Sequence, residues 1–214
     1  MFESTKKPKV LVIGGTRGIG KNIVDHFNGD SISRRGTDPG FDIRSAEDRL
    51  TIAKHSLNYD LVVNHAYTGS HGVPDATLDD GPADVSQTFM LKALYDEWKE
   101  ANHKGYLFNS SSDSSMLWRM KPGKDVIYAA MKASQNAVSQ FISRDVQEAN
   151  VRMRYTNIIW GMLDTELSRV KPHYNNGVRG DDVCKLIETL YSLPPDCLIP
   201  YFIMEARWIN HKSL

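Results

Sequence analysis

Short apolar runs alternate with segments of helical periodicity along most of the chain. The first run, 10–13, is fully apolar, as expected for a strand buried on both faces of a parallel sheet, and 18–28 has its apolar residues at helical spacing. Further strands are predicted at 31–33, 41–43, 61–63, 106–108, 151–159 and 198–204, and further helices at 45–55, 82–101, 125–150 and 181–193. Ser45 is the expected cap of the helix at 45–55, with Asp48 as its capping-box partner.

This alternation predicts an α/β fold: one doubly wound, Rossmann-type domain over residues 1–214, with a mostly parallel sheet and helices on both faces. Such sheets bind ligands at the carboxyl ends of their strands. Polar motifs that directly follow strands are therefore the candidates for chemistry.

Composition narrows the class of protein. The formal net charge is zero, which argues against nucleic acid or an anionic membrane surface as a partner. The two cysteines, Cys184 and Cys197, form no CxxC pair, and the histidines show no metal-binding spacing, so no metal is expected. No apolar run is long enough to span a membrane, and the polar N-terminus has no signal-peptide core, so we expect a cytoplasmic protein.

A glycine motif joins the first strand to the first helix. Gly14, Gly18 and Gly20 have the spacing GxxxGxG. Glycine permits a tight turn and a close approach of phosphate, and the helix N-terminus supplies free N–H groups. In this position the motif favours a dinucleotide site over a simple glycine-rich turn.

Basic residues refine the cofactor. Ser33 and Arg34 follow the second strand, where an NAD enzyme usually places an acidic residue on the ribose. An arginine there, with Arg17 in the glycine loop, suits a 2′-phosphate and predicts NADP(H). The alternative is that Arg34 and Arg35 are ordinary surface charges.

Tyr128 and Lys132 lie four residues apart in the predicted helix 125–150 and share one face of it. A free phenol has a pKa of about 10. An ammonium at about 4 Å, with an effective dielectric near 20, favours the phenolate by up to roughly 4 kcal/mol. Tyr128 could then exchange a proton with an alcohol or carbonyl oxygen. A surface pair is the alternative, but the serine run 110–112 after a strand offers a hydroxyl for the substrate oxygen.

Together these motifs resemble the short-chain dehydrogenase/reductase family over residues 9–167. The resemblance implies Ser112, Tyr128 and Lys132 as catalytic residues, with Ser111 as the alternative serine. It implies a small carbonyl or alcohol substrate and a homodimer or homotetramer built on helices 82–101 and 125–149, with Leu91, Leu94, Trp98, Val138 and Phe141 as candidate interface residues. The implied cofactor residues are Gly14, Thr16, Arg17, Gly18, Ile19, Gly20, Ser33, Arg34, Asp42, Ile43, Asn64, His65, Ala66, Tyr128, Lys132, Gly161, Leu163 and Thr165.

The chain also departs from the family pattern. His65 and Tyr67 alter the family's NNAG turn, and Trp160 replaces a proline in its PGxxxT segment. The family's catalytic asparagine has no evident counterpart, because the stretch 84–87 places Ser86 there. The crossover helix after the second strand is expected to be missing, and 165–180 is expected to form a short substrate lid.

Two other functions stay open at this point. The altered turn and the missing asparagine are compatible with a nucleotide-binding sensor or scaffold protein with little turnover. An epimerase that recycles its nicotinamide is a third reading, disfavoured by the short C-terminal region. The leading hypothesis is an NADPH-dependent carbonyl reductase or alcohol dehydrogenase.

Overall fold

Six parallel strands form one sheet in the computed structural model, which describes residues 7–34, 40–66, 85–116, 126–148, 150–169 and 176–206. The order across the sheet is β2-β1-β3-β4-β5-β6, and every neighbouring pair is parallel. The strands are β1 (Val10–Ile13), β2 (Asp30–Ile32), β3 (Leu61–Asn64), β4 (Tyr106–Ser112), β5 (Arg154–Trp160) and β6 (Tyr201–Met204). The predicted doubly wound α/β fold is confirmed.

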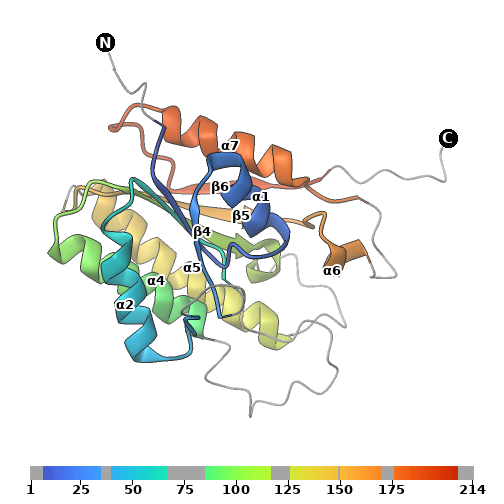
Figure 1. Ribbon diagram of the computed structural model, residues 1–214, viewed down its shortest axis with the longest axis horizontal. Coiled ribbons are helices and arrows are strands. Elements are labelled where there is room, and N and C mark those ends of the chain that lie inside the picture. The colour runs from blue at the N-terminus through green and yellow to red at the C-terminus, as the bar shows by residue number, and fades with distance from the viewer. Residues whose placement is uncertain are drawn as a thin grey trace.

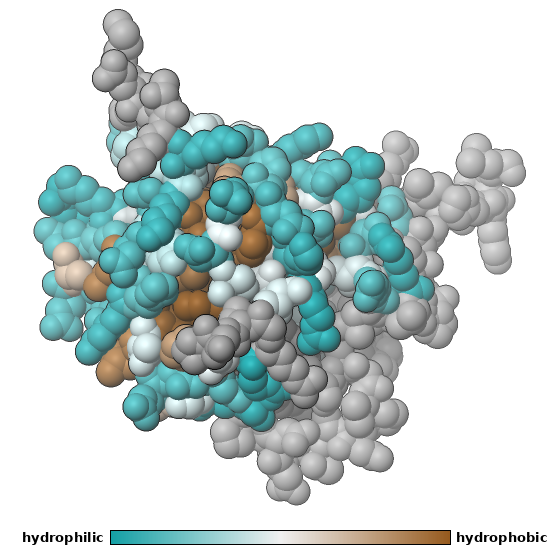
Figure 2. All heavy atoms as spheres, viewed as in Figure 1, coloured by the Kyte–Doolittle hydropathy of each residue, from teal (hydrophilic) through white to brown (hydrophobic). Residues whose placement is uncertain are grey.

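Helices cover both faces of this sheet (Figure 1). On one face lie α1 (Gly18–Phe27) and α7 (Gly180–Ser192), and on the other α2 (Ala46–Ser56), α4 (Ser86–Glu100) and α5 (Val126–Gln147). Alternate residues of each strand feed the two cores, so that Val10 and Val12 face α1 and α7 while Leu11 and Ile13 face the other three helices. In Figure 2 hydrophobic residues gather in the middle of the visible face, between two largely hydrophilic regions.

The prediction of a strand at 41–43 is wrong. Asp42 instead starts the turn that leads into α2: its N–H donates to the Asp48 carboxylate at 2.7 Å, and its carbonyl oxygen accepts from Ser45 at 2.8 Å. Ser45 does cap α2, accepting from the Asp48 N–H, but the Asp48 carboxylate serves Asp42 rather than completing a capping box. Within the described residues β2 is the edge strand, and the expected absence of a crossover helix stays a prediction, because residues 35–39 lie outside the described part of the chain.

Several element ends also differ from the prediction. Strand β4 continues through the serines to Ser112, whereas 106–108 was predicted, and β5 and β6 begin later than predicted, at Arg154 and Tyr201. Helix α4 begins at Ser86, and residues 82–84 of the predicted helix lie outside the described part of the chain. The serines extend β4 because each hydroxyl finds a polar partner, as shown below.

Part of the expected subunit interface is also wrong. Leu91, Leu94 and Trp98 are fully buried inside the monomer, where they pack in the core beneath α2 and α5. They are therefore not available to a second subunit. Among the side chains that the structure describes, the large apolar ones that α4 and α5 expose are Phe89 and Phe141, at 51% and 55%.

Candidate active site

The glycine loop lies at the carboxyl end of β1 and can hold nothing larger than glycine at two positions. A Cβ on Gly14, whose φ is +92°, would lie 2.6 Å from the Ala66 Cα, and one on Gly20 would lie 2.2 Å from the Gly14 carbonyl oxygen. Glycine at both positions therefore lets β1, the loop after β3 and the start of α1 pack closely together.

A phosphate could approach this loop at the start of α1. Gly18 also has a positive φ, +54°, and a Cβ there would meet only the Thr165 methyl group, at 3.7 Å. No side chain caps the N-terminus of α1, and its first turn carries no acidic residue. The free N–H groups and the positive end of the helix dipole are thus left for an anion. Ile19 is buried against the sheet and anchors the helix.

The expected 2′-phosphate corner contains an additional arginine. Arg34 lies 3.9 Å from the Asp42 carboxylate, which also accepts from the Arg44 guanidinium. Arg44, by its hydrogen bond and its charge, holds the pKa of Asp42 below its usual range. Two guanidinium groups thus lie beside the Asp42 carboxylate. Thr16 and Ser33, whose hydroxyl oxygens are 3.1 Å apart, tie the glycine loop to the end of β2.

The family resemblance implies that Asp42 and Ile43 contact the adenine of the cofactor. In the structure Ile43 is buried in the core on the α2 side of the sheet, whereas Asp42 is held by Arg44. The two neighbours therefore lie in different surroundings. The adenine contact remains a prediction for both.

Tyr128 and Lys132 lie near the start of α5. Lys132 is buried, with 5% of its surface exposed, and its Nζ lies 5.9 Å from the centre of the Tyr128 ring. Its ammonium donates to Gln87 Oε1 at 2.7 Å and to Gln135 Oε1 at 3.2 Å. Burial disfavours the charged form and lowers the pKa of Lys132 to about 7.

Three buried asparagines form a row across the sheet beside this lysine. Asn64, Asn109 and Asn157 are register partners on β3, β4 and β5. The Asn64 amide donates to Asn109 at 3.0 Å, and the Asn109 amide donates to Asn157 at 2.7 Å. Gln135 also donates to Asn109, at 2.9 Å, which connects the row to Lys132. A buried amide without partners costs about 1–3 kcal/mol, so this pairing is what permits polar residues in the strands.

The same network reaches the serines at the end of β4. Asn157 and Ser111 both donate to the Asn136 side-chain oxygen, at 2.9 and 2.8 Å. The Asn136 amide donates to Ser115, at 2.6 Å, and Ser115 bonds the carbonyl oxygen of Ser112. Ser111 thus turns toward α5. Ser112 lies where the strand ends, and its hydroxyl accepts from Ser114 N–H at 3.2 Å and starts a 3₁₀ turn (Asp113–Ser115).

Solved structures with a similar fold are known. Comparison of the sequence with family models and with curated proteins finds no match. Among solved structures, a short-chain dehydrogenase from Burkholderia cenocepacia J2315 in complex with NADP has a TM-score of 0.73 at 18% identity, over 92% of this chain and 95% of that one.

Two other neighbours are complexed with NADP+ and with NADH, respectively. The closed form of a serine dehydrogenase complexed with NADP+ has a TM-score of 0.72 at 21% identity, over 96% and 97% of the two chains. A 3-alpha-hydroxysteroid dehydrogenase from Pseudomonas sp. B-0831, complexed with NADH, has a TM-score of 0.68 at 18% identity, over 91% and 93%. The chain has the short-chain dehydrogenase fold.

His65 and Trp160, which both depart from the short-chain dehydrogenase pattern, contact the same hydroxyl, that of Ser110. The Trp160 indole donates to Ser110 Oγ at 2.8 Å, and His65 Nδ1 lies 2.8 Å from the same oxygen. Burial, and then the charge of Lys132, lower the pKa of His65 to about 4, so this histidine is neutral at neutral pH. Trp160 is a core residue that links β5 to β4.

The segment after β5 returns to the glycine loop, as the short-chain dehydrogenase fold implies. Gly161 donates to Met204 at 2.9 Å, Leu163 bridges to Val178, and Thr165 lies beside Gly18. The pairing at Val178 brings the two ends of the expected lid together around the short helix α6 (Glu166–Arg169). Residues 170–175 lie outside the described part of the chain, so the lid remains a prediction.

Sequence reasoning missed the residues that hold Lys132 and the serines: Gln87, Asn109, Gln135, Asn136 and Asn157. Two signals were available. Asparagine closes or interrupts otherwise apolar strands at 64, 109 and 157, and 135 and 136 are three and four residues beyond Lys132 on the same helix face. Gln87 had no such signal, because only the packing of α4 on α5 brings it to the lysine.

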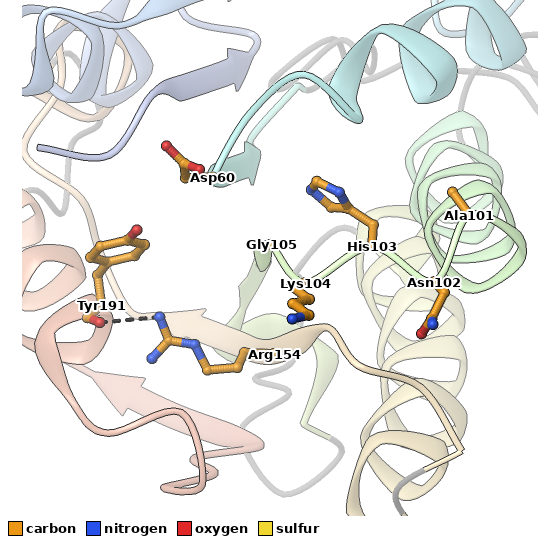
Figure 3. A pocket seen from close by; sticks show the side chains of 8 residues that line it. All are labelled: Asp60, Ala101, Asn102, His103, Lys104, Gly105, Arg154 and Tyr191. Atoms are coloured by element: carbon orange, nitrogen blue, oxygen red, sulfur yellow. Dashed lines mark hydrogen bonds between the residues drawn. The ribbon is translucent and has the colours of Figure 1, made fainter. Parts of the chain in front are cut away.

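A cavity lies at the end of the sheet opposite to the proposed site (Figure 3). This cavity of about 380 Å³ is lined by residues that precede or begin strands, including Asp60, Gly105 and Arg154. The Arg154 guanidinium donates to the carbonyl oxygens of Tyr191 and Leu193, at 3.1 and 2.9 Å. The Arg154 guanidinium therefore binds carbonyl oxygens at the C-terminus of α7, which is a structural role.

The described residues contain neither a helix that could span a membrane nor a metal-binding cluster. None of the helices that the structure describes is both long and apolar enough to cross a membrane. In the same part of the chain, no three histidine, cysteine or acidic side chains are grouped so as to hold a metal ion.

Proposed function

We propose that the chain is an NADP(H)-dependent oxidoreductase that acts on a small carbonyl or alcohol substrate, with Tyr128 as the acid and base. The observation that carries this proposal is that the buried Lys132 lies against the Tyr128 ring, its Nζ 5.9 Å from the ring centre, on a helix whose Asn136 accepts from Ser111 near the carboxyl end of β4. This is where a doubly wound sheet binds its ligand.

The residues present suit a dinucleotide. Gly14, Gly18 and Gly20 leave the N-terminus of α1 open to its phosphates, and Arg34 and Arg44 offer two guanidinium forks to a 2′-phosphate. Asn64 Oδ1 is buried and accepts no hydrogen bond from the residues that the structure describes, which leaves one acceptor at the end of β3. When bound, the nicotinamide supplies or accepts the hydride.

The chain's own residues then handle the substrate oxygen. In reduction, Tyr128 gives its phenolic proton to the carbonyl oxygen as the alcohol forms, and in oxidation it takes that proton back. The Lys132 ammonium lowers the cost of the resulting phenolate. Ser112 donates a hydrogen bond to the same oxygen. Turnover with a panel of aldehydes, ketones, quinones and pterins, followed by NADPH consumption, tests the proposal; NADPH binding with no turnover on the panel would instead support a sensor.

Cofactor choice gives a specific prediction. Arg34→Asp is expected to weaken NADPH binding about 10- to 100-fold, because a charge-assisted hydrogen bond is worth about 1.5–3 kcal/mol, while NADH binding stays the same or improves. Dissociation constants for both cofactors in moderate salt check it. Arg144→Asp, an exposed change of equal charge near the far end of α5, is the control. Equal affinity of the wild type for both cofactors, or unchanged NADPH affinity in Arg34→Asp, contradicts this.

We further propose a homodimer or homotetramer. Phe89 and Phe141 are half exposed on α4 and α5, and a second copy would cover them. Light scattering at micromolar concentration should give two or four times the chain mass of 24.1 kDa, and Phe141→Lys should shift the protein toward the monomer. A wild-type protein that scatters as a monomer would refute this prediction.

A further inference from the structure

Lys132 is held from two helices. Gln135 lies three residues along α5, one turn from Lys132 itself, whereas Gln87 reaches across from the first turn of α4. The bond from α4 is the shorter of the two, 2.7 Å against 3.2 Å. Gln87 is buried, with 4% of its surface exposed, so the contact is made away from water. The position of the ammonium therefore depends on where α4 packs.

The two glutamines bind the ammonium without neutralising it. An amide oxygen stabilises a cation by one hydrogen bond, whereas a carboxylate would also supply a full opposite charge. Among the residues that the structure describes, Tyr128 on the same helix and His65 at the end of β3 are titratable groups that face Lys132, and His65 is neutral. A neutral anchor leaves the positive charge of Lys132 available to the Tyr128 phenolate.

We propose that Gln87 is a positioning residue whose side-chain oxygen fixes the Lys132 ammonium beside Tyr128, in the place of the asparagine that this chain lacks. This rests on the proposed function in one respect, namely that Lys132 serves Tyr128. The contact itself, and its control over the lysine, do not depend on turnover. Gln87 acts through Lys132 and is not itself a catalytic residue.

Two substitutions at one position separate the effects. Gln87→Glu keeps the shape and adds a charge, so it should raise the pKa of Lys132 by one unit or more. Gln87→Leu removes the acceptor, so it should lower the pKa further below its wild-type value near 7. Lysine Hε–Cε correlations in NMR spectra, assigned with Lys132→Ala, report these titrations without any substrate.

The pH dependence of activity should change with the pKa of Lys132. The pH above which carbonyl reduction declines should move upward in Gln87→Glu and downward in Gln87→Leu, and the kcat of Gln87→Leu at neutral pH should fall at least tenfold. A merely structural role would change stability and leave the pH profile in place. Because Gln87→Glu is nearly isosteric and gains an ion pair, it keeps the test informative even if Gln87→Leu folds poorly.

The matched control is Thr88→Val. Thr88 is the next residue of α4, and its hydroxyl also spans the gap to α5, 2.9 Å from Ser134. It should leave the Lys132 titration unchanged. The proposal is overturned if Lys132 titrates alike in Gln87→Glu, Gln87→Leu and the wild type, or if Thr88→Val shifts it as much. A shifted titration with no turnover in the wild type would uphold the role of Gln87 in holding Lys132 and refute the proposed function alone.

Discussion

Tyr128→Phe is expected to lower kcat by about 10²- to 10⁴-fold, the usual contribution of a general acid or base. Phenylalanine keeps the ring beside Lys132 and deletes only the hydroxyl that exchanges the proton. Cofactor affinity should therefore stay nearly unchanged. Steady-state rates and calorimetric titration with NADPH measure the two quantities on the same preparation.

Two further variants make this result specific. Lys132→Ala should lower both the rate and the cofactor affinity, since Lys132 supports the phenolate and, by family resemblance, binds the nicotinamide ribose. Tyr191→Phe removes a phenol from the far end of the sheet and should leave both quantities unchanged. A Tyr128→Phe enzyme that keeps more than a tenth of the wild-type rate would rule out Tyr128 as the acid and base.

The second large effect is expected at Ser112. Ser112→Ala should lower kcat by 10²- to 10³-fold, because one hydrogen bond to the developing oxyanion is worth about 2.7–4 kcal/mol. Ser111→Ala is the matched control, since the Ser111 hydroxyl donates to Asn136 at 2.8 Å and serves the scaffold. That variant should lose about 1 kcal/mol of stability and keep most of its rate.

The comparison of the two serine variants has three outcomes. A Ser112→Ala enzyme that is crippled while Ser111→Ala works supports the assignment. The reverse result shifts the catalytic position by one residue. If neither variant loses even tenfold, no serine of this pair acts on the substrate oxygen. Rates with one working substrate, together with melting curves for both proteins, distinguish these outcomes.

Local patterns in the sequence predicted most of the fold. The apolar strand 10–13 and the amphipathic helix 18–28 each lie where their periodicity places them, since burial on both faces or on one stripe leaves a strong signal. Polar residues inside strands are a weaker signal. Ser110 to Ser112 read as a loop, yet they extend β4 because His65, Trp160 and Asn136 meet them from other elements.

The residues of the candidate site likewise fall into those that the sequence predicts and those that it does not. Tyr128 and Lys132 could be predicted because both lie on one helix, four residues apart, and the glycines because they lie on one turn. Gln87 and the hydrogen bonds that join the asparagine row could not, because the partners are distant in the chain: 45 residues separate Gln87 from Lys132, and 48 separate Asn109 from Asn157. Such contacts exist only after the sheet register and the helix packing are fixed.

Transfer of deuterium from the reduced nicotinamide of labelled NADPH is the most direct test of the central claim. Purified protein would be incubated with the carbonyl panel, and the alcohols formed would be analysed by mass spectrometry. The account predicts one deuterium on the former carbonyl carbon of each alcohol formed, with transfer reduced at least tenfold in Tyr128→Phe. NADPH that binds well but labels no product would contradict it.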